Sequence, residues 1–157
     1  MKRTKKRMIL CMLLLAAVLS FIWGNSLASG ETSGNMSGRI MQWINTVLRL
    51  DEGGADILHR LIRKGAHFTE FACLGLLLTW LFGMMGEKKG HLFCMPLLFG
   101  MMAACVDETI QVFVPDRGPS PVDIWIDTCG VAAGIVILIM GHLYVRKKHT
   151  MNLEETT

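Results

Sequence analysis

The stretch VDIWIDTCGVAAGIVILIMGHLYV, residues 122–145, decides the fold class of this chain. It is long and apolar enough to cross a bilayer as one helix, because a crossing takes about 20 mostly apolar residues. Three further apolar blocks precede it, at residues 8–27, 66–85 and 91–111, in a chain of 157 residues with a mean hydropathy of +0.42. We therefore predict an all-α integral membrane protein, with residues 1–157 forming a single domain built as a four-helix bundle of transmembrane helices.

Basic residues predict the orientation of these spans. MKRTKKR precedes the first block, GEKKGH joins the second to the third, and RKKH follows the last. With four crossings these three segments fall on one side, and short loops rich in Lys and Arg mark the cytoplasmic side. We predict that both termini are cytoplasmic (N-in/C-in) in a multi-pass protein of the cell membrane. Residues 24 to about 64 and the loop at 115–121 then face outward, although the outer segment also carries arginines.

The first apolar block has a second interpretation. Its basic start, its apolar run and the sequence Ser26-Leu27-Ala28 resemble a signal peptide that is cleaved from the mature protein. The run is long for a signal peptide, and cleavage would leave three crossings with the same loops. We therefore favour a retained transmembrane helix.

The outer segment contains one predicted helix. In SGRIMQWINTVLRL, residues 37–50, apolar side chains recur at helical spacing and polar ones lie opposite. The pattern is typical of a helix lying on the membrane surface, or of an ordinary amphipathic helix packed against the bundle. We predict a short extracytoplasmic amphipathic helix here.

All the cysteines lie inside the apolar blocks and none lies in a polar loop. This placement argues against a disulfide framework and predicts small buried thiols. The residues concerned are Cys11, Cys73, Cys94, Cys105 and Cys129.

Ionisable residues occur at a similar depth in three of the apolar blocks. Counted from the cytoplasmic anchors at 1.5 Å per residue, Glu70, Asp107 and Asp127 lie roughly 25 to 28 Å along their helices. Such groups are costly in lipid unless paired or hydrated, and they usually face the interior of a bundle. We predict an outward-facing polar cup that binds a ligand, formed by Lys64, His67, Glu70, Asp107, Glu108, Gln111, Arg117, Asp123 and Asp127.

Asp123 and Asp127 share one narrow stripe of their helix with Gly130 and Gly134. The two glycines form a GxxxG pattern, which lets another helix approach closely, so the stripe is expected to face protein. That helix belongs either to the same chain or to a second copy, and an oligomer formed through Gly130 and Gly134 is one of these two alternatives.

Several cup residues also have purely structural interpretations. Asp123 lies in a helix-capping sequence, and Asp127 is a candidate ion-pair partner of Arg117. His67 and Glu70 are three residues apart on one helix face, which suits a hydrogen-bonded pair. A His-x-x-Glu pattern alone is a weak metal-binding signal. We predict no metal ion and no other cofactor.

Two motifs resemble the signatures of the VanZ-like family of membrane proteins. KGAHFTEFACLGLLL, residues 64–78, is similar to its Lys-x-x-His-Phe-x-Glu-aromatic signature. DETIQVFVPDRGPSPVDIWIDTCGVAAG, residues 107–134, is similar to its second signature. The resemblance covers residues 60–145 and carries over the nine cup residues and Gly130, while Phe71 stands where the family often has Tyr. It implies a small bacterial multi-pass membrane protein, and family members have been linked to resistance to teicoplanin and related glycopeptides.

Three functions compete for such a protein. We favour one that binds or acts on a cell-envelope ligand, such as a lipid-linked precursor or a lipoglycopeptide, and contributes to glycopeptide tolerance. The alternative is a membrane-embedded enzyme in which His67, Glu70 or Glu108 provides acid–base catalysis, although no motif specifies a reaction. A proton-coupled carrier is disfavoured because the acids lie near one edge of the bilayer. The bilayer is the expected partner, and nothing predicts nucleic-acid binding, since the basic residues serve as topology anchors.

Overall fold

The computed structural model describes residues 2–27, 52–86, 90–115 and 117–154, and all the regular secondary structure in these ranges is helical. The helices are α1 (Lys2–Leu27), α3 (Glu52–Met84), α4 (His91–Val112) and α5 (Pro121–Glu154). Each contains a span long and apolar enough to cross a membrane, so the predicted all-α fold with four candidate spans is confirmed. The amphipathic helix predicted at 37–50 lies outside the described residues.

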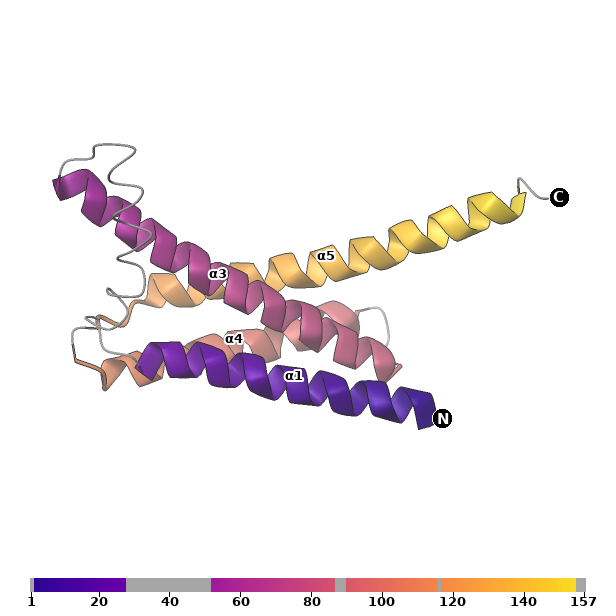
Figure 1. The fold of residues 1–157 in the computed structure, drawn as a ribbon, viewed down its shortest axis with the longest axis horizontal. Coiled ribbons are helices and arrows are strands. Elements are labelled where there is room, and N and C mark those ends of the chain that lie inside the picture. The colour runs from indigo at the N-terminus through magenta and orange to yellow at the C-terminus, as the bar shows by residue number, and fades with distance from the viewer. Residues whose placement is uncertain (1, 28–51, 87–89, 116, 155–157) are drawn as a thin grey trace.

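The four helices run alternately up and down, and the N- and C-terminal ends of the chain lie at the same end of the bundle (Figure 1). A chain that crosses an even number of times brings its two termini to the same end. Helix α3 contacts each of the other three helices, and α4 also contacts α1 and α5. Which end of the bundle faces the cytoplasm stays a prediction from the basic residues.

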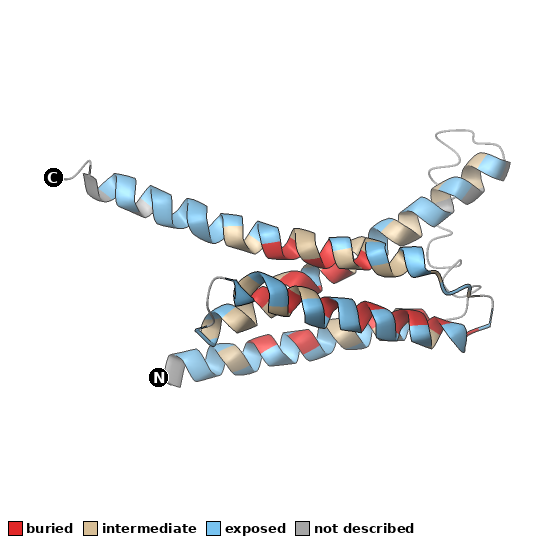
Figure 2. Ribbon diagram, turned by 180° about the vertical axis from the view of Figure 1, so that it is seen from behind, coloured by how far each residue is buried: buried red, intermediate tan, exposed pale blue. Residues whose placement is uncertain are grey.

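Helices α3 and α5 extend well beyond their apolar blocks. They contain 33 and 34 residues, which at 1.5 Å per residue is about 50 Å, whereas the hydrocarbon core is about 30 Å thick. The spans predicted at 66–85 and 122–145 therefore mark the apolar parts of longer helices. The C-terminal part of α5, beyond the bundle, is exposed (Figure 2).

A narrow apolar core holds the helices together. Small residues allow close approach: an added Cβ at Gly130 or Gly134 on α5 would collide with backbone atoms of Phe68 or Ala72 on α3. The GxxxG stripe thus packs within the chain, and an oligomer formed through it is not supported, because α3 already occupies it. The core residues are Cys11, Leu15, Ile22, Phe71, Leu74, Ala103, Ala104, Val131 and Ile135.

All five cysteines are free thiols, as predicted. Only Cys11 is buried, and the prediction of burial was wrong for the other four, which are exposed on helix surfaces. The reason is that an apolar block in a membrane protein supplies both the core and the lipid-facing surface, so an apolar position in the sequence does not imply a buried one.

Candidate functional site

Polar side chains gather at the end of the bundle where α1 and α4 end and α5 begins. A pocket lies there between α3, α4, α5 and the loop before α5. Of the nine predicted cup residues, all except Glu70 and Asp107 line it. The full lining is Arg63, Lys64, His67, Glu108, Gln111, Arg117, Asp123, Ile126 and Asp127.

Glu108 fixes the loop before α5 to helix α4. Its Oε2 accepts a 2.7 Å hydrogen bond from the backbone N–H of Ser120, and its Oε1 accepts one of 3.3 Å from Gln111 Nε2. The same amide nitrogen donates to Asp107 Oδ2 at 3.0 Å. Gln111 therefore links two buried carboxylates one helical turn below it, and all three side chains are held in place on α4.

An ion pair between Lys64 and Asp123 joins α3 to the first turn of α5. The Ser120 hydroxyl accepts a 3.3 Å hydrogen bond from the N–H of Val122, and α5 begins at Pro121. Ser120 thus supplies the capping contact that the sequence suggested, while the Asp123 side chain reaches across to Lys64.

Glu70 points toward α1 instead of into the pocket. Its Oε1 accepts a 3.2 Å hydrogen bond from Asn25 Nδ2, and the backbone oxygen of Asn25 accepts one of 3.1 Å from Arg117 Nη2. The alternative of a hydrogen-bonded pair between His67 and Glu70 is not formed, because Glu70 contacts α1 and His67 lies against α4. Sequence reasoning missed Asn25, although the polar Asn25-Ser26 pair that ends the first apolar block was a usable signal.

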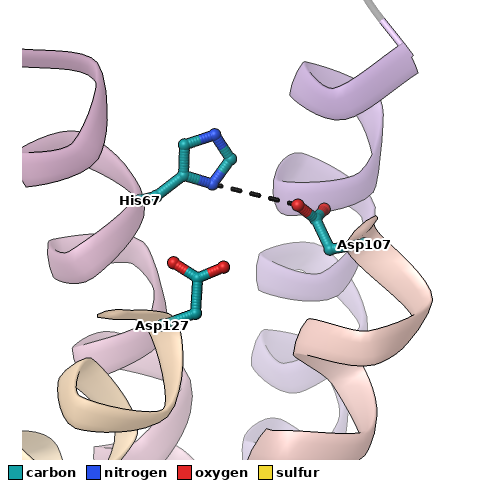
Figure 3. Close-up of side chains that lie close together, drawn as sticks. All are labelled: His67, Asp107 and Asp127. Carbon is teal, nitrogen blue, oxygen red and sulfur yellow. Dashed lines mark ion pairs between the residues drawn. The ribbon is translucent and has the colours of Figure 1, made fainter. Parts of the chain in front are cut away.

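His67, Asp107 and Asp127 converge from α3, α4 and α5 (Figure 3). His67 Nδ1 lies 3.9 Å from Asp107 Oδ2, and one ligand-type atom from each residue lies within 4.8 Å of the others. Both aspartates are buried, with exposed fractions of 0% and 2%. The candidate acid–base residues therefore do not form one group: His67 contacts α4, Glu70 contacts α1, and Glu108 contacts the loop before α5.

The pocket has a mixed charge. Three basic side chains and three carboxylates line it, together with His67. Partial burial lowers the pKa of Arg117, as does the neighbouring Arg63, while Asp107 and Glu108 act in the opposite direction. A guanidinium stays protonated at neutral pH after such a shift, so Arg117 is a permanent positive charge in this pocket.

Glu108 also lines a second, largely apolar groove between α4 and the start of α5. This groove is on the outer surface of the bundle, where Thr109, Val112 and Pro121 are exposed. Glu108 is the residue shared by the charged pocket and the groove. The groove is lined by Cys105, Glu108, Thr109, Val112, Pro119, Ser120, Pro121 and Ile124.

Comparison with known proteins agrees with this architecture. The family model described as VanZ/LLP1 matches residues 9–143. The chain belongs to the VanZ/LLP1 family. The resemblance carried by the two motifs is thus confirmed, and the match includes most of α1. No curated protein and no solved structure shows a significant match.

Phe71, which stands where VanZ-like proteins often have Tyr, is fully buried in the core and so belongs to the packing between helices.

Proposed function

We propose that the charged pocket binds the polar headgroup of a lipid-linked cell-envelope ligand, and that this binding contributes to glycopeptide tolerance. The observation that supports it best is the position of Glu108, which lines both the charged pocket and the apolar groove between α4 and α5. A lipid that lies in the bilayer can place its chain along such a groove while its headgroup reaches the pocket.

The chemistry of the lining suits an anionic headgroup. Arg63 and Arg117 both line the pocket, and guanidinium groups bind phosphate or carboxylate through paired hydrogen bonds. Lys64 is paired with Asp123, so it contributes charge but is already bound to a carboxylate. The enclosed part of the pocket has room for about one water-sized group. The pocket is therefore expected to hold only the terminal part of a headgroup, and the remainder stays at the membrane surface.

A membrane-embedded enzyme is the second candidate. The observation that favours it is the contact between His67 and buried Asp107, since a histidine held by a carboxylate is a common arrangement for proton transfer. The two candidates predict different mutational patterns. An enzyme loses its function almost completely when one acid–base residue is replaced, whereas a binding site loses affinity gradually as several contacts are removed.

Teicoplanin susceptibility in a sensitive bacterial host tests the proposal. The host expresses the wild type, Glu108→Gln, Asp123→Asn or an empty vector, and membrane levels are matched by immunoblot. Arg60→Gln serves as the control, because Arg60 is an exposed residue of α3 one turn before Lys64 and does not line the pocket. We expect the wild type and Arg60→Gln to raise the inhibitory concentration, and the two pocket variants to raise it less.

Each result has a clear meaning. Partial losses in both pocket variants support a binding site, and a complete loss in Glu108→Gln alone supports an enzyme in which Glu108 is the acid–base residue. If the wild type gives the same susceptibility as the empty vector, this chain has no role in teicoplanin tolerance. If Arg60→Gln fails as badly as the pocket variants at equal protein level, the effect does not come from the pocket.

A further inference from the structure

The group formed by His67, Asp107 and Asp127 has a geometry that the headgroup proposal does not use. The three side chains come from α3, α4 and α5, and their carboxylates and imidazole ring approach one another in Figure 3. In the sequence, Asp107 and Asp127 are far from His67, and only the packing of three helices brings them together. This is why the His-x-x-Glu pattern was a poor guide: Glu70 faces α1, and the two carboxylates beside His67 come from other helices.

Each member of this group has an atom that lacks a hydrogen-bond partner. These atoms are His67 Nδ1, Asp107 Oδ1 and Asp127 Oδ1, and all three are buried. Buried polar atoms are paired in the great majority of cases, so these three atoms, together with Ser26 Oγ beside Asp107, need an explanation. Asp127 is the clearest case, since its side chain is almost fully buried and its carboxylate is directed toward the other two residues.

The group combines two buried carboxylates with one imidazole ring. Two buried carboxylates at this separation repel each other in a medium of low dielectric constant. Three basic side chains lie nearby: Lys64 pairs with Asp123, Arg117 donates to the backbone oxygen of Asn25, and Arg63 lines the same pocket. The remaining neighbours on α4 are Gln111, which donates one hydrogen bond to Asp107, and Glu108, which adds a carboxylate.

We propose that His67, Asp107 and Asp127 bind one divalent transition-metal ion, of which Zn²⁺ and Mn²⁺ fit the ligand set best. An imidazole with two carboxylates is a typical ligand set for such ions, and the imidazole disfavours Mg²⁺ and Ca²⁺. Ligand bonds of about 2.0 to 2.2 Å place neighbouring ligand atoms roughly 3 to 3.5 Å apart. The 3.9 Å between His67 Nδ1 and Asp107 Oδ2 therefore needs only a small closure.

The metal ion would have an open side toward the pocket. His67 and Asp127 line the pocket as well as the three-residue group. With three protein ligands, a tetrahedral ion keeps a fourth position for water or for an anionic oxygen of a ligand. The inference goes beyond the proposed function, because a metal ion at this site is measurable whether or not the chain affects glycopeptide tolerance.

The test uses the full chain purified in detergent with an affinity tag that contains no histidine. The protein is stripped with EDTA and dialysed against Zn²⁺, Mn²⁺ or Mg²⁺, and bound metal is measured by mass spectrometry. Thermal unfolding is followed with and without each ion. We expect about one Zn²⁺ or Mn²⁺ per chain with a rise in Tm, because an ion that binds only the folded state stabilises it, and we expect no effect of Mg²⁺.

Two sets of variants locate the ion. His67→Asn and Asp127→Asn should each lose the bound metal and the rise in Tm. The control His142→Gln removes an exposed histidine of α5 outside the group and should keep both. The absorption spectrum of the Co²⁺ form separates ligation by nitrogen and oxygen from binding to the free cysteines, which adds sulfur charge-transfer bands.

The proposal fails if the wild type binds no Zn²⁺ or Mn²⁺, a result that does not depend on how the variants fold. It also fails if His67→Asn and Asp127→Asn retain the full equivalent of metal, or if the Co²⁺ spectrum shows thiolate ligation. Failure here leaves the teicoplanin test unaffected, since that test uses Glu108 and Asp123.

Discussion

The backbone N–H of Ser120 donates a 2.7 Å hydrogen bond to Oε2 of Glu108, so a side chain of α4 holds the residue that precedes α5. Glu108 is 5% exposed, and little water is available to replace this bond. Glu108→Gln keeps one carbonyl oxygen that can accept from Ser120 and loses only the longer 3.3 Å bond from Gln111, whereas Glu108→Met keeps a similar volume but has no oxygen.

We therefore expect Glu108→Met to lower the free energy of unfolding by about 1 to 3 kcal/mol, the cost of leaving a buried N–H unpaired, and Glu108→Gln to lower it by less than about 1 kcal/mol. Thermal unfolding of the purified chains in one detergent measures both. Equal losses in the two variants would show that the bond to Ser120 does not hold the loop. The small effect expected for Glu108→Gln also makes it the right variant for the susceptibility test, since its functional loss is then separate from misfolding.

Close packing between α3 and α5 predicts a strong effect of one methyl group. A Cβ at Gly134 would collide with the carbonyl oxygen of Ala72 and lie 2.9 Å from the backbone nitrogen of Leu76. Because backbone atoms cannot move aside locally, the two helices must separate. We expect Gly134→Ala to lower the free energy of unfolding by about 1 to 3 kcal/mol.

Gly141 provides the matched control for this substitution. It lies on the same helix, is exposed, and has no atom within 4 Å of an added Cβ. Gly141→Ala should leave Tm unchanged or raise it, because Ala favours a helix over Gly by up to about 1 kcal/mol. Thermal unfolding of both variants in detergent distinguishes the two sites. A Gly134→Ala variant that melts no lower than the wild type would contradict the close approach of α5 to α3.

The helices and the polar layer could be predicted from the sequence for a simple physical reason. Apolar blocks long enough to cross the hydrocarbon core predict which residues form the membrane-spanning helices. Counting residues from the basic anchors then predicts the depth of each acidic residue in the membrane. This counting placed Glu70, Asp107 and Asp127 at one level, and the structure brings the last two beside His67. The lengths of α3 and α5 were not predictable in this way, because hydropathy marks the part of a helix inside lipid and not its ends.

The pairing of side chains could not be predicted, because it depends on which helix packs against each face. The position of His67 on its helix allows a contact with Glu70 on α3 or with a residue of another helix. The sequence left both contacts open, and the packing of α4 against α3 selected Asp107. Similarly, Glu70 was assigned to the cup because its neighbours on α3 pointed there, and the polar Asn25-Ser26 pair at the end of α1 did not indicate which helix it would contact.

The contact between Asn25 and Glu70 predicts a rescue by exchange. In the wild type, the Asn25 amide donates a 3.2 Å hydrogen bond to the Glu70 carboxylate. Asn25→Asp replaces this donor with a second carboxylate. We therefore expect a lower Tm, because the hydrogen bond is lost and the two carboxylates repel each other. The double variant Asn25→Asp, Glu70→Gln restores one amide donor and one carboxylate acceptor with their places exchanged. Its Tm should recover at least half of the loss.

The single variant Glu70→Gln is the control for this exchange, since it removes a charge without adding one and should change Tm less than Asn25→Asp. Thermal unfolding of the wild type and the three variants forms a double-mutant cycle, and the pair should show a coupling of about 0.5 kcal/mol or more. Additive effects would mean that Asn25 and Glu70 do not interact.

The predicted orientation decides whether the pocket can meet a ligand from outside the cell. Pro119, beside the pocket, and Lys147, near the other end of α5, are both exposed. With both termini cytoplasmic, a maleimide that does not cross membranes should label Pro119→Cys in intact cells. The same reagent should label Lys147→Cys only after the cells are permeabilised. The parent chain is the baseline, because its five cysteines lie in membrane-spanning helices, where a charged reagent reacts poorly.

The reverse pattern would place the pocket on the cytoplasmic side. Teicoplanin outside the cell could then not be its direct ligand, and the headgroup proposal would require a lipid of the inner leaflet, while the metal site would stand unchanged.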